Sequence, residues 1–300
     1  MTDAPSTTTR SRALVDAATG RLGAAGVASP RADAHLLLAH VLGVPRGEVA
    51  ALLVLDREIP GAAAAAFESL VTRRERREPL QHLTGSAPFR HVELAVGPGV
   101  FVPRPETEAV AQVAIDEARR VVAERGGAVV VDLCTGSGAI ALSIATEVPG
   151  ARVHAVELDA AAHEWAARNL AGSGIGLVRG DARTALRDLD DVVDVVVSNP
   201  PYVPSDAVPR DPEVADHDPA VALYGLGPDG LEVPRGITAA AVRLLRDGGL
   251  YVMEHAEVQD AAARAMVDAC GAFDQATTRS DLTGRPRMVV ARRRRARVED

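Results

Sequence analysis

The chain has 300 residues, of which 47% are hydrophobic and 25% charged, and its formal net charge is −8. This is the composition of a soluble globular protein, long enough for one large domain and one small one. The acidic balance argues against a protein that works through general contacts with nucleic-acid phosphates, and no lysine occurs at all. No apolar run approaches the ~18–20 residues that cross a bilayer, and the polar start does not look like a signal peptide. Two cysteines, Cys134 and Cys270, are too few for a disulfide framework. We therefore expect a cytoplasmic protein with no membrane contact and no stable nucleic-acid partner.

Residues 1–79 are predicted to form a small helical domain without strands. Ser29 followed by Pro30 is a typical helix start, and the apolar residues of 32–42 recur at helical spacing until Gly43. A second helix is expected from about residue 61 through the charged stretch 73–77.

Residues 80–104 are predicted to form a β-hairpin linker. Glycines and prolines interrupt short β-prone pieces here, among them residues 92–96 and the turn 97–99.

From residue 105 to 300 strands and helices are expected to alternate. Short valine-rich runs separated by helices indicate a parallel sheet covered on both faces, with one antiparallel strand near the end. The fold class is therefore α/β. Strands are predicted at 128–133, 152–157, 176–179, 192–198, 249–254, 272–278 and 287–291, and helices at 106–124, 139–147, 160–170, 231–245 and 258–269.

A glycine-rich turn joins the first of these strands to its helix and predicts a cofactor site. The turn comprises Cys134, Thr135, Gly136, Ser137 and Gly138. Its glycines allow a ligand to approach the backbone closely, and the helix start favours a carboxylate or phosphate.

Three acidic residues accompany this turn. Glu157 lies about 20 residues downstream, where an acid can accept hydrogen bonds from both ribose hydroxyls. Asp181 ends the third strand, where it can accept from an adenine amino group, and Asp132 would lie near a methionine amine. On the turn alone both S-adenosylmethionine and a nicotinamide cofactor stay open, because glycine, glycine and alanine also fit the looser dinucleotide pattern.

The segment Asn199, Pro200, Pro201 and Tyr202 follows the fourth strand and predicts the chemical site. An amide or exocyclic amine nitrogen is a poor nucleophile because its lone pair is delocalised. The Asn199 side-chain oxygen and the Pro200 carbonyl can accept its two N–H bonds, and the prolines hold these acceptors in place. Two fixed acceptors stabilise the nitrogen as it becomes partly positive, and Tyr202 offers an aromatic face to the planar group. We expect Asn199 to contact the cofactor as well, and no metal ion is needed.

Together these motifs closely resemble the release factor glutamine methyltransferases. The likeness runs from about residue 31 to 292 and is carried by residues 78–85, 89, 101–108, 132–140, 198–202, 212–214, 218–220, 222–223 and 227–231. The resemblance implies a seven-stranded Rossmann-like class I methyltransferase sheet, a helical domain for substrate recognition and S-adenosylmethionine as cofactor. It implies methylation of the glutamine amide in the Gly-Gly-Gln motif of class I peptide-chain release factors. Phe101 and Arg104 would line the pocket from the linker side.

Two positions depart from the family pattern. Cys134 stands where the family often has glycine, and Ala182 stands where an aromatic residue often packs against adenine. The alternatives are a glutamine methyltransferase of a ribosomal protein, an adenine amino-methyltransferase on nucleic acid, and a cofactor-binding scaffold without catalysis.

Overall fold

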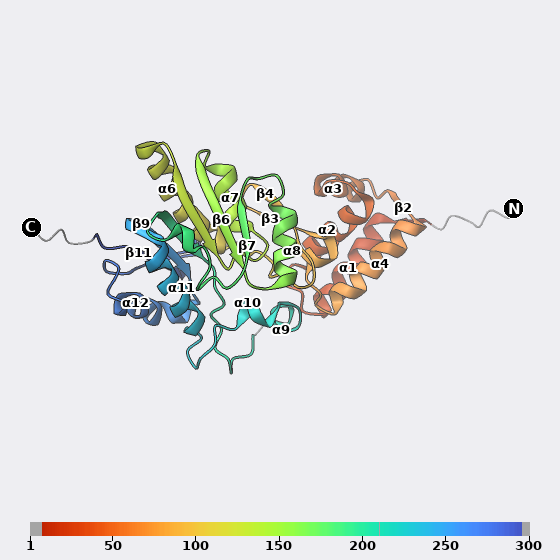
Figure 1. The fold of residues 1–300 in the computed structure, drawn as a ribbon. Helices are drawn as coiled ribbons and strands as arrows, with labels where there is room; N and C mark the ends of the chain where they lie inside the picture. Colours follow the sequence, from red (N-terminus) through yellow and green to blue (C-terminus); the bar gives the residue numbers. More distant parts are fainter. Residues whose placement is uncertain (1–7, 210, 296–300) are drawn as a thin grey trace, which may run out of the picture. The chain divides into compact units, whose positions relative to one another are not determined.

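The computed structural model describes residues 8–209 and 211–295 of the chain (Figure 1). The helices are α1 (Ser11–Ala24), α2 (Pro30–Leu42), α3 (Arg46–Val54), α4 (Gly61–Glu75), α5 (Leu80–Thr84), α6 (Thr107–Arg125), α7 (Ala139–Glu147), α8 (Ala160–Asn169), α9 (Pro212–His217), α10 (Ala220–Leu223), α11 (Glu232–Leu244) and α12 (Asp260–Ala269), with short 3₁₀ turns η1 (Arg187–Leu189) and η2 (Glu257–Gln259). The strands are β1 (Thr8–Arg10), β2 (Glu58–Pro60), β3 (Ser86–Phe89), β4 (Val92–Ala95), β5 (Ala128–Leu133), β6 (Ala151–Glu157), β7 (Gly176–Arg179), β8 (Val193–Ser198), β9 (Leu245–Glu254), β10 (Thr277–Ser280) and β11 (Pro286–Arg292).

The chain divides into two compact units. The first comprises residues 1–86 together with 209–217, and the second comprises residues 87–208 and 218–300. The short segment 209–217 therefore packs with the helical unit, although the sheet unit flanks it on both sides in sequence. The boundaries predicted at residues 79 and 104 stay a prediction.

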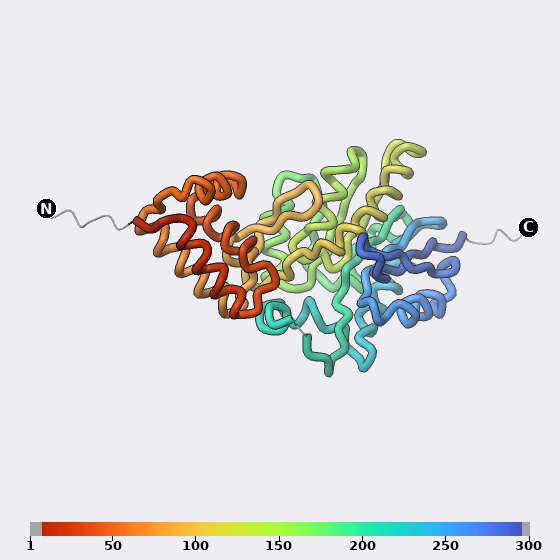
Figure 2. Tube along the Cα trace, turned by 180° about the vertical axis from the view of Figure 1, so that it is seen from behind, coloured from red at the N-terminus to blue at the C-terminus, as the bar shows by residue number. Residues whose placement is uncertain are grey.

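The first unit is a small helical bundle with its own apolar core. Helices α1, α2 and α4 lie side by side, as Figure 2 shows in red and orange. Leu22, Leu37 and Phe67 are fully buried between them. As predicted, α2 begins with Pro30 and ends at Gly43, whose φ of 66° closes the helix in the left-handed conformation.

The prediction that this part of the chain contains no strand is wrong. Strands β1 and β2 pair antiparallel over three residues each, from Thr8 opposite Pro60 to Arg10 opposite Glu58. Pieces this short carry no detectable alternation in sequence, and only the folded helices bring them together.

The second unit contains the seven-stranded sheet, in the order β10-β11-β9-β8-β5-β6-β7. Strand β5 pairs parallel with both β6 and β8, so chain order reverses between β5 and β8. Strand β11 runs antiparallel to both of its neighbours. Ligands bind such open sheets at the carboxyl ends of the strands beside this reversal. The predicted sheet is confirmed, including its single antiparallel strand.

Two apolar layers cover the sheet, because successive side chains along each strand point to opposite faces of the sheet. Val130, Val195 and Val197 face the layer formed with α6, α7 and α8. Val131 and Val196 face the opposite layer, formed with α11 and α12. Helix α11 shows the pattern clearly, since Ile237, Ala240, Ala241 and Leu244 share its buried stripe.

The predicted hairpin is present as β3 and β4, which form a two-stranded sheet of their own. Phe89 and Leu94 are fully buried and join the core that contains α6 and α7. The described residues hold no single helix that is long and apolar enough to span a membrane, although α2 and α3, with a 102° bend between them, pass the same length and composition test as a pair.

Candidate active site

The glycine turn after β5 has a backbone that only a few residue types adopt easily. Gly136 and Gly138 have φ values of 59° and 87°, and Cys134 also has a positive φ of 62°. A Cβ added at Gly136 would meet nothing within 4 Å, so the turn leaves open space on that side. Backbone N–H groups of Thr135 and Gly136 point to the end of β6.

Glu157 ends β6 and holds this turn. Its Oε2 accepts from the Gly136 N–H at 2.8 Å, and its Oε1 accepts from the Asp159 N–H at 2.8 Å. Burial raises the pKa of Glu157, although these backbone donors act in the opposite direction. A carboxylate offers about four acceptor positions, so two stay available to a ligand.

Asp132 lies fully buried at the end of β5. Its Oδ2 accepts from the Thr135 hydroxyl at 2.6 Å and the Ala141 N–H at 3.2 Å. Its Oδ1 has no hydrogen-bond partner among the described residues. Burial raises the pKa of Asp132 to about 7, and the nearby Glu157 carboxylate acts in the same direction. A buried carboxyl with one unused oxygen fits a site for a cationic group.

Asp181 is brought to the same edge of the sheet, because the Gly180 N–H donates to the Glu157 carbonyl at 2.9 Å. Its carboxylate, however, pairs with Arg183 through bonds of 2.7 to 3.0 Å, and this pairing lowers its pKa. Ala182 is buried in the core on the α11 side. Asp181 therefore has an internal partner that an adenine group would have to share.

The motif that begins at Asn199 follows β8 directly. The Asn199 Nδ2 donates to the Thr107 hydroxyl at 3.3 Å, and its Oδ1 has no donor among the described residues. Pro200 is buried, and within the described part of the chain no group donates to its carbonyl. Two acceptors are thus left unpaired at the carboxyl end of the central strand.

Tyr202 is fixed through both its backbone and its side chain. Its N–H donates to the Leu223 carbonyl at 3.1 Å, and its carbonyl accepts from the Gln259 Nε2 at 2.8 Å. Its hydroxyl donates to the Glu254 Oε1 at 3.4 Å. Burial raises the pKa of the Tyr202 hydroxyl, and so does the Glu254 carboxylate.

Sequence reasoning missed four residues of this site. Thr107 contacts Asn199, and Glu254 contacts Tyr202. Gln259, which bonds to the Tyr202 carbonyl, also donates to the Asp229 carbonyl at 2.9 Å. Asn169 ties the hairpin to the glycine turn, because its Nδ2 donates to the carbonyls of Ala95 and Ser137. Asn169 carried a signal, since only two asparagines occur in the whole chain. The other three lie far from the motif in sequence.

The linker residues Phe101 and Arg104 lie against each other. The Arg104 guanidinium carbon is 4.7 Å from the centroid of the Phe101 ring. Arg104 also donates to the buried Asp218 carboxylate at 2.7 Å. This ion pair joins the linker to the loop that follows the motif.

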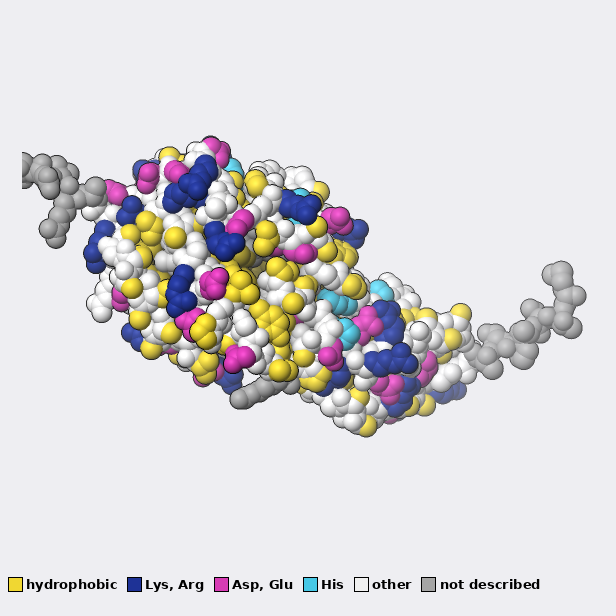
Figure 3. Space-filling model, turned by 60° about the horizontal axis from the view of Figure 1, so that its bottom comes forward, with side chains coloured by type: hydrophobic (Ala, Val, Ile, Leu, Met, Phe, Trp, Pro, Cys, Tyr) yellow, Lys and Arg dark blue, Asp and Glu magenta, His cyan; other side chains and the backbone are white. Residues whose placement is uncertain are grey.

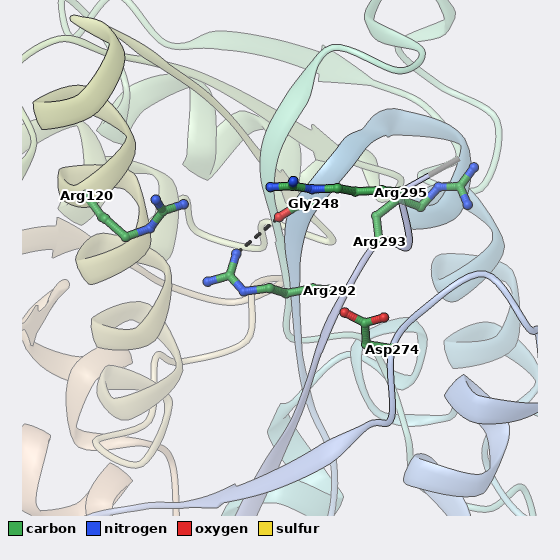
Figure 4. A pocket seen from close by; sticks show the side chains of 6 residues that line it. All are labelled: Arg120, Gly248, Asp274, Arg292, Arg293 and Arg295. Carbon is green, nitrogen blue, oxygen red and sulfur yellow. Dashed lines mark hydrogen bonds between the residues drawn. The ribbon is translucent and has the colours of Figure 1, made fainter. Parts of the chain in front are cut away.

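A separate cavity of about 600 Å³ lies at the opposite edge of the sheet (Figure 4). It is lined by Arg120, Gly248, Asp274, Arg292, Arg293 and Arg295. Two of its arginines are already paired with the buried Glu117 carboxylate. Gly248 and Arg292 lie at the amino end of β9, whereas Glu254 lies at its carboxyl end. The cavity therefore takes no part in the site around Asn199.

The residues at the carboxyl edge fit S-adenosylmethionine. The open space at Gly136 lets the ligand approach the protein backbone of the turn. The unused oxygen of Asp132 suits the ammonium group of the ligand, and the free acceptor positions of Glu157 suit its ribose. When bound, S-adenosylmethionine supplies a methyl group activated by a sulfonium. Among the described residues no cluster of three or more histidine, cysteine or acidic side chains could hold a metal ion.

Two family models match this chain, and solved structures share parts of its fold. Residues 13–85 match the family model of the PrmC N-terminal domain, and residues 107–212 match the methyltransferase small domain. The solved 16S rRNA N2 G1207 methyltransferase of T. thermophilus, in complex with AdoMet and guanosine, is similar at a TM-score of 0.47 and 22% identity, over 70% of this chain and 50% of that one.

Several curated relatives match over nearly their whole length. The release factor glutamine methyltransferase of Mycolicibacterium smegmatis is 52% identical over 95% of this chain and 98% of its own. The enzyme of the same name from Streptomyces coelicolor is 50% identical over 94% and 97%. A 4-amino-L-phenylalanine/4-methylamino-L-phenylalanine methyltransferase of Streptomyces pristinaespiralis is 41% identical over 88% and 89%. Identity at this level over both chains shows that the protein belongs to the release factor glutamine methyltransferase family of S-adenosylmethionine-dependent enzymes.

Proposed function

We propose that this chain methylates the side-chain amide nitrogen of the glutamine in the Gly-Gly-Gln motif of class I peptide-chain release factors. Relatives that are 52% and 50% identical to this chain are named release factor glutamine methyltransferases. One observation carries the proposal at the level of atoms: the Asn199 Nδ2 donates a hydrogen bond to the Thr107 hydroxyl, so the Asn199 Oδ1 faces away from it as a free acceptor. Beside it the Pro200 carbonyl is a second free acceptor within the described residues.

These two acceptors suit a primary amide. Its nitrogen carries two N–H bonds, and each acceptor takes one of them, so the nitrogen is oriented with its lone pair toward the methyl donor. As the nitrogen becomes tetrahedral and partly positive, both oxygens stabilise it without reorganising. The partly buried Tyr202 side chain packs against the planar amide, and the product proton leaves to water.

A second candidate substrate is a small aromatic amine. The relative from Streptomyces pristinaespiralis is named for 4-amino-L-phenylalanine and is 41% identical over most of both chains. An aniline nitrogen resembles an amide nitrogen, since both lone pairs are delocalised. The higher identity to the relatives named for release factors, 52% and 50%, favours the protein substrate.

We also propose a cytoplasmic location without a stable nucleic-acid partner. The relatives are named for release factors, and both cysteines are free thiols. On the face drawn in Figure 3 the arginines are interspersed with acidic side chains, and they do not gather into one basic patch. A net charge of −8 further weakens attraction to phosphates.

The decisive experiment measures transfer of labelled methyl groups to purified release factor. Wild-type release factor is compared with one in which the glutamine of its Gly-Gly-Gln motif is changed to alanine. We expect label on the wild-type factor alone. The same assay includes 4-amino-L-phenylalanine, ribosomal proteins and adenine-containing RNA and DNA as alternative acceptors. Label on one of these and on neither release factor would overturn the proposed substrate.

A further inference from the structure

Glu254 lies beside the catalytic motif because of the sheet register. Strands β8 and β9 run parallel with Ser198 opposite Met253, so Asn199, the first residue after β8, lies beside Glu254, the last residue of β9. Glu254 is 1% exposed. A carboxyl group this deeply buried is rare unless it has a structural or chemical task.

The Glu254 carboxyl is surrounded by hydroxyl donors. Its Oε1 accepts from the Tyr202 hydroxyl at 3.4 Å. The Thr107 hydroxyl lies close enough to the carboxylate to lower its pKa. Its Oε2 has no hydrogen-bond partner among the described residues. The carboxylate thus lies between Tyr202, which is proposed to pack against the substrate, and Thr107, which contacts Asn199.

Thr107 has a single hydroxyl proton, which can be donated either to the Glu254 carboxylate or to the Asn199 oxygen, but not to both. When that proton is donated to Glu254, only lone pairs stay available toward Asn199. The Asn199 side chain then presents its NH₂ group to Thr107, as the 3.3 Å contact from Nδ2 shows. Its oxygen consequently faces the other way. A flipped amide would place two acceptors against each other.

We propose that Glu254 is a positioning residue for methyl transfer. Through Thr107 it fixes the Asn199 amide with its oxygen toward the substrate nitrogen, and through the Tyr202 hydroxyl it fixes the ring that packs the substrate. This inference rests on the proposed function only for the identity of the methyl acceptor. The orientation of Asn199 is a property of the enzyme alone.

The protonation state of Glu254 controls this arrangement. Burial raises the pKa of Glu254 to about 7. Glu106, before α6, acts in the same direction, whereas Arg287 on β11 and the hydroxyls of Thr107 and Tyr202 lower the pKa. A protonated Glu254 can donate a hydrogen bond, which frees the Thr107 proton to turn toward Asn199. The preference for one amide orientation is then lost.

The chain offers a direct test because it contains only two asparagines, Asn169 and Asn199. Selective ¹⁵N labelling of asparagine gives two side-chain NH₂ pairs in a heteronuclear NMR spectrum, and Asn199→Ala identifies the pair of Asn199 by its loss. We expect Glu254→Gln and Thr107→Val to shift the Asn199 pair. Thr107→Ser keeps the hydroxyl and should leave it in place. Glu257→Gln is the matched control, since Glu257 lies three residues away on η2 with its side chain 53% exposed.

Kinetics test the consequence for transfer. We expect Glu254→Gln and Thr107→Val each to lower kcat, on the order of 10²-fold as for a misplaced reacting group, with little change in KM for the acceptor. The double variant should be no slower than either single variant, because both break the same chain of contacts. The wild-type kcat should fall below about pH 7, and this inflection should be absent in Glu254→Gln.

The outcomes separate the inference from the proposed function. Asn199 NH₂ signals that are the same in Glu254→Gln and in the wild type would overturn the positioning role, whatever the acceptor. A shifted pair in an enzyme that does not methylate release factor would sink the proposed substrate and leave the positioning role standing. Unchanged kcat in Glu254→Gln at every pH, with release factor methylated normally, would overturn the inference as well.

Discussion

The Glu157 carboxylate accepts a hydrogen bond from the Gly136 N–H at 2.8 Å, so the end of β6 holds the glycine turn that follows β5. Gly136 lies in the turn after β5 and Glu157 ends the neighbouring strand β6, and we propose that the remaining acceptor positions of this carboxylate bind ribose hydroxyls. On this proposal, one side chain both supports the turn and binds the ligand.

Glu157→Ala should weaken S-adenosylmethionine binding by about 10- to 100-fold, because hydrogen bonds to a charged acceptor contribute roughly 1.5–3 kcal/mol. Isothermal titration calorimetry measures the Kd. Glu164→Ala is a suitable control, since Glu164 is an exposed residue of α8. An unchanged Kd in Glu157→Ala would place the ribose elsewhere.

Asn199→Ala should abolish methyl transfer and leave cofactor affinity nearly unchanged. The reason is that the Asn199 Oδ1 is a free acceptor that we propose for the substrate, whereas we propose the glycine turn and Glu157 for the cofactor. Transfer is measured with labelled methyl groups and affinity by calorimetry, on the same preparation. A parallel loss of both would mean that Asn199 supports the fold of the site and does not chiefly orient the substrate.

Much of the sheet could be predicted because its strands are short apolar runs bounded by clear turns. The predicted bounds of β5, β7 and α7 coincide with those of the structure. Strand β9 begins four residues earlier than predicted, at Leu245. The prediction missed this first part because it contains Arg246, Asp247 and two glycines. That stretch lacks the apolar signal, and its extended form depends on neighbouring strands.

The site was predictable only where its residues are consecutive in sequence. The turn 134–138 and the motif 199–202 are local patterns, each with a chemical reason for its residue types. Thr107 and Glu254 join them only through the register of β8 and β9 and the start of α6. No spacing rule connects positions so far apart, so folding has to bring them together before their chemistry is visible.

S-adenosylmethionine affinity should rise with pH between about 6 and 7. The pKa of Asp132 is raised to about 7, so the ionised form that attracts an ammonium group is lost as the pH falls through that value. The slope can reach about tenfold per pH unit below 7. Calorimetry at several pH values measures it. Asp132→Asn should bind weakly with no such slope, and an equal slope in that variant would assign the titration to another group.

Arg74→Ala should destabilise the helical unit strongly. Arg74 is buried and donates to Asp33 at 2.8 Å and to Glu213 at 2.7 Å, so its removal leaves the Asp33 carboxylate without its cationic partner, whereas Glu213 keeps Arg77. Breaking such a buried pair costs about 3–5 kcal/mol. Urea unfolding measures the loss, and hydrogen exchange should accelerate in α9, which Glu213 anchors to this unit.

Arg76→Ala provides the comparison for Arg74→Ala, because Arg76 is an exposed residue that caps the same helix α4. It should unfold within about 0.5 kcal/mol of the wild type, as surface substitutions usually do. Equal urea midpoints for the two variants would show that the ion pairs of Arg74 add nothing to the stability of this unit.

Cys134 should be chemically inert although it lies in the cofactor turn. Burial raises the pKa of its thiol, and the carboxylates of Glu157 and Asp132 raise it further. The thiolate is the reactive form, so alkylation with iodoacetamide near pH 8 should modify the exposed Cys270 first. Peptide mass spectrometry distinguishes the two positions, and rapid modification of Cys134 in the folded enzyme would contradict this.

Cys134→Gly should retain methyl transfer and nearly the full stability of the wild type. The φ of 62° at Cys134 is a conformation in which a non-glycine residue is strained by about 1–2 kcal/mol, and glycine removes that strain. The side chain packs partly against the core on the α11 side, and losing this contact offsets the gain. Cys134→Val is the contrasting variant, since a β-branched residue tolerates positive φ poorly. Equal unfolding temperatures and equal methyl-transfer rates for the valine and glycine variants would show that the positive φ does not determine which residue position 134 tolerates.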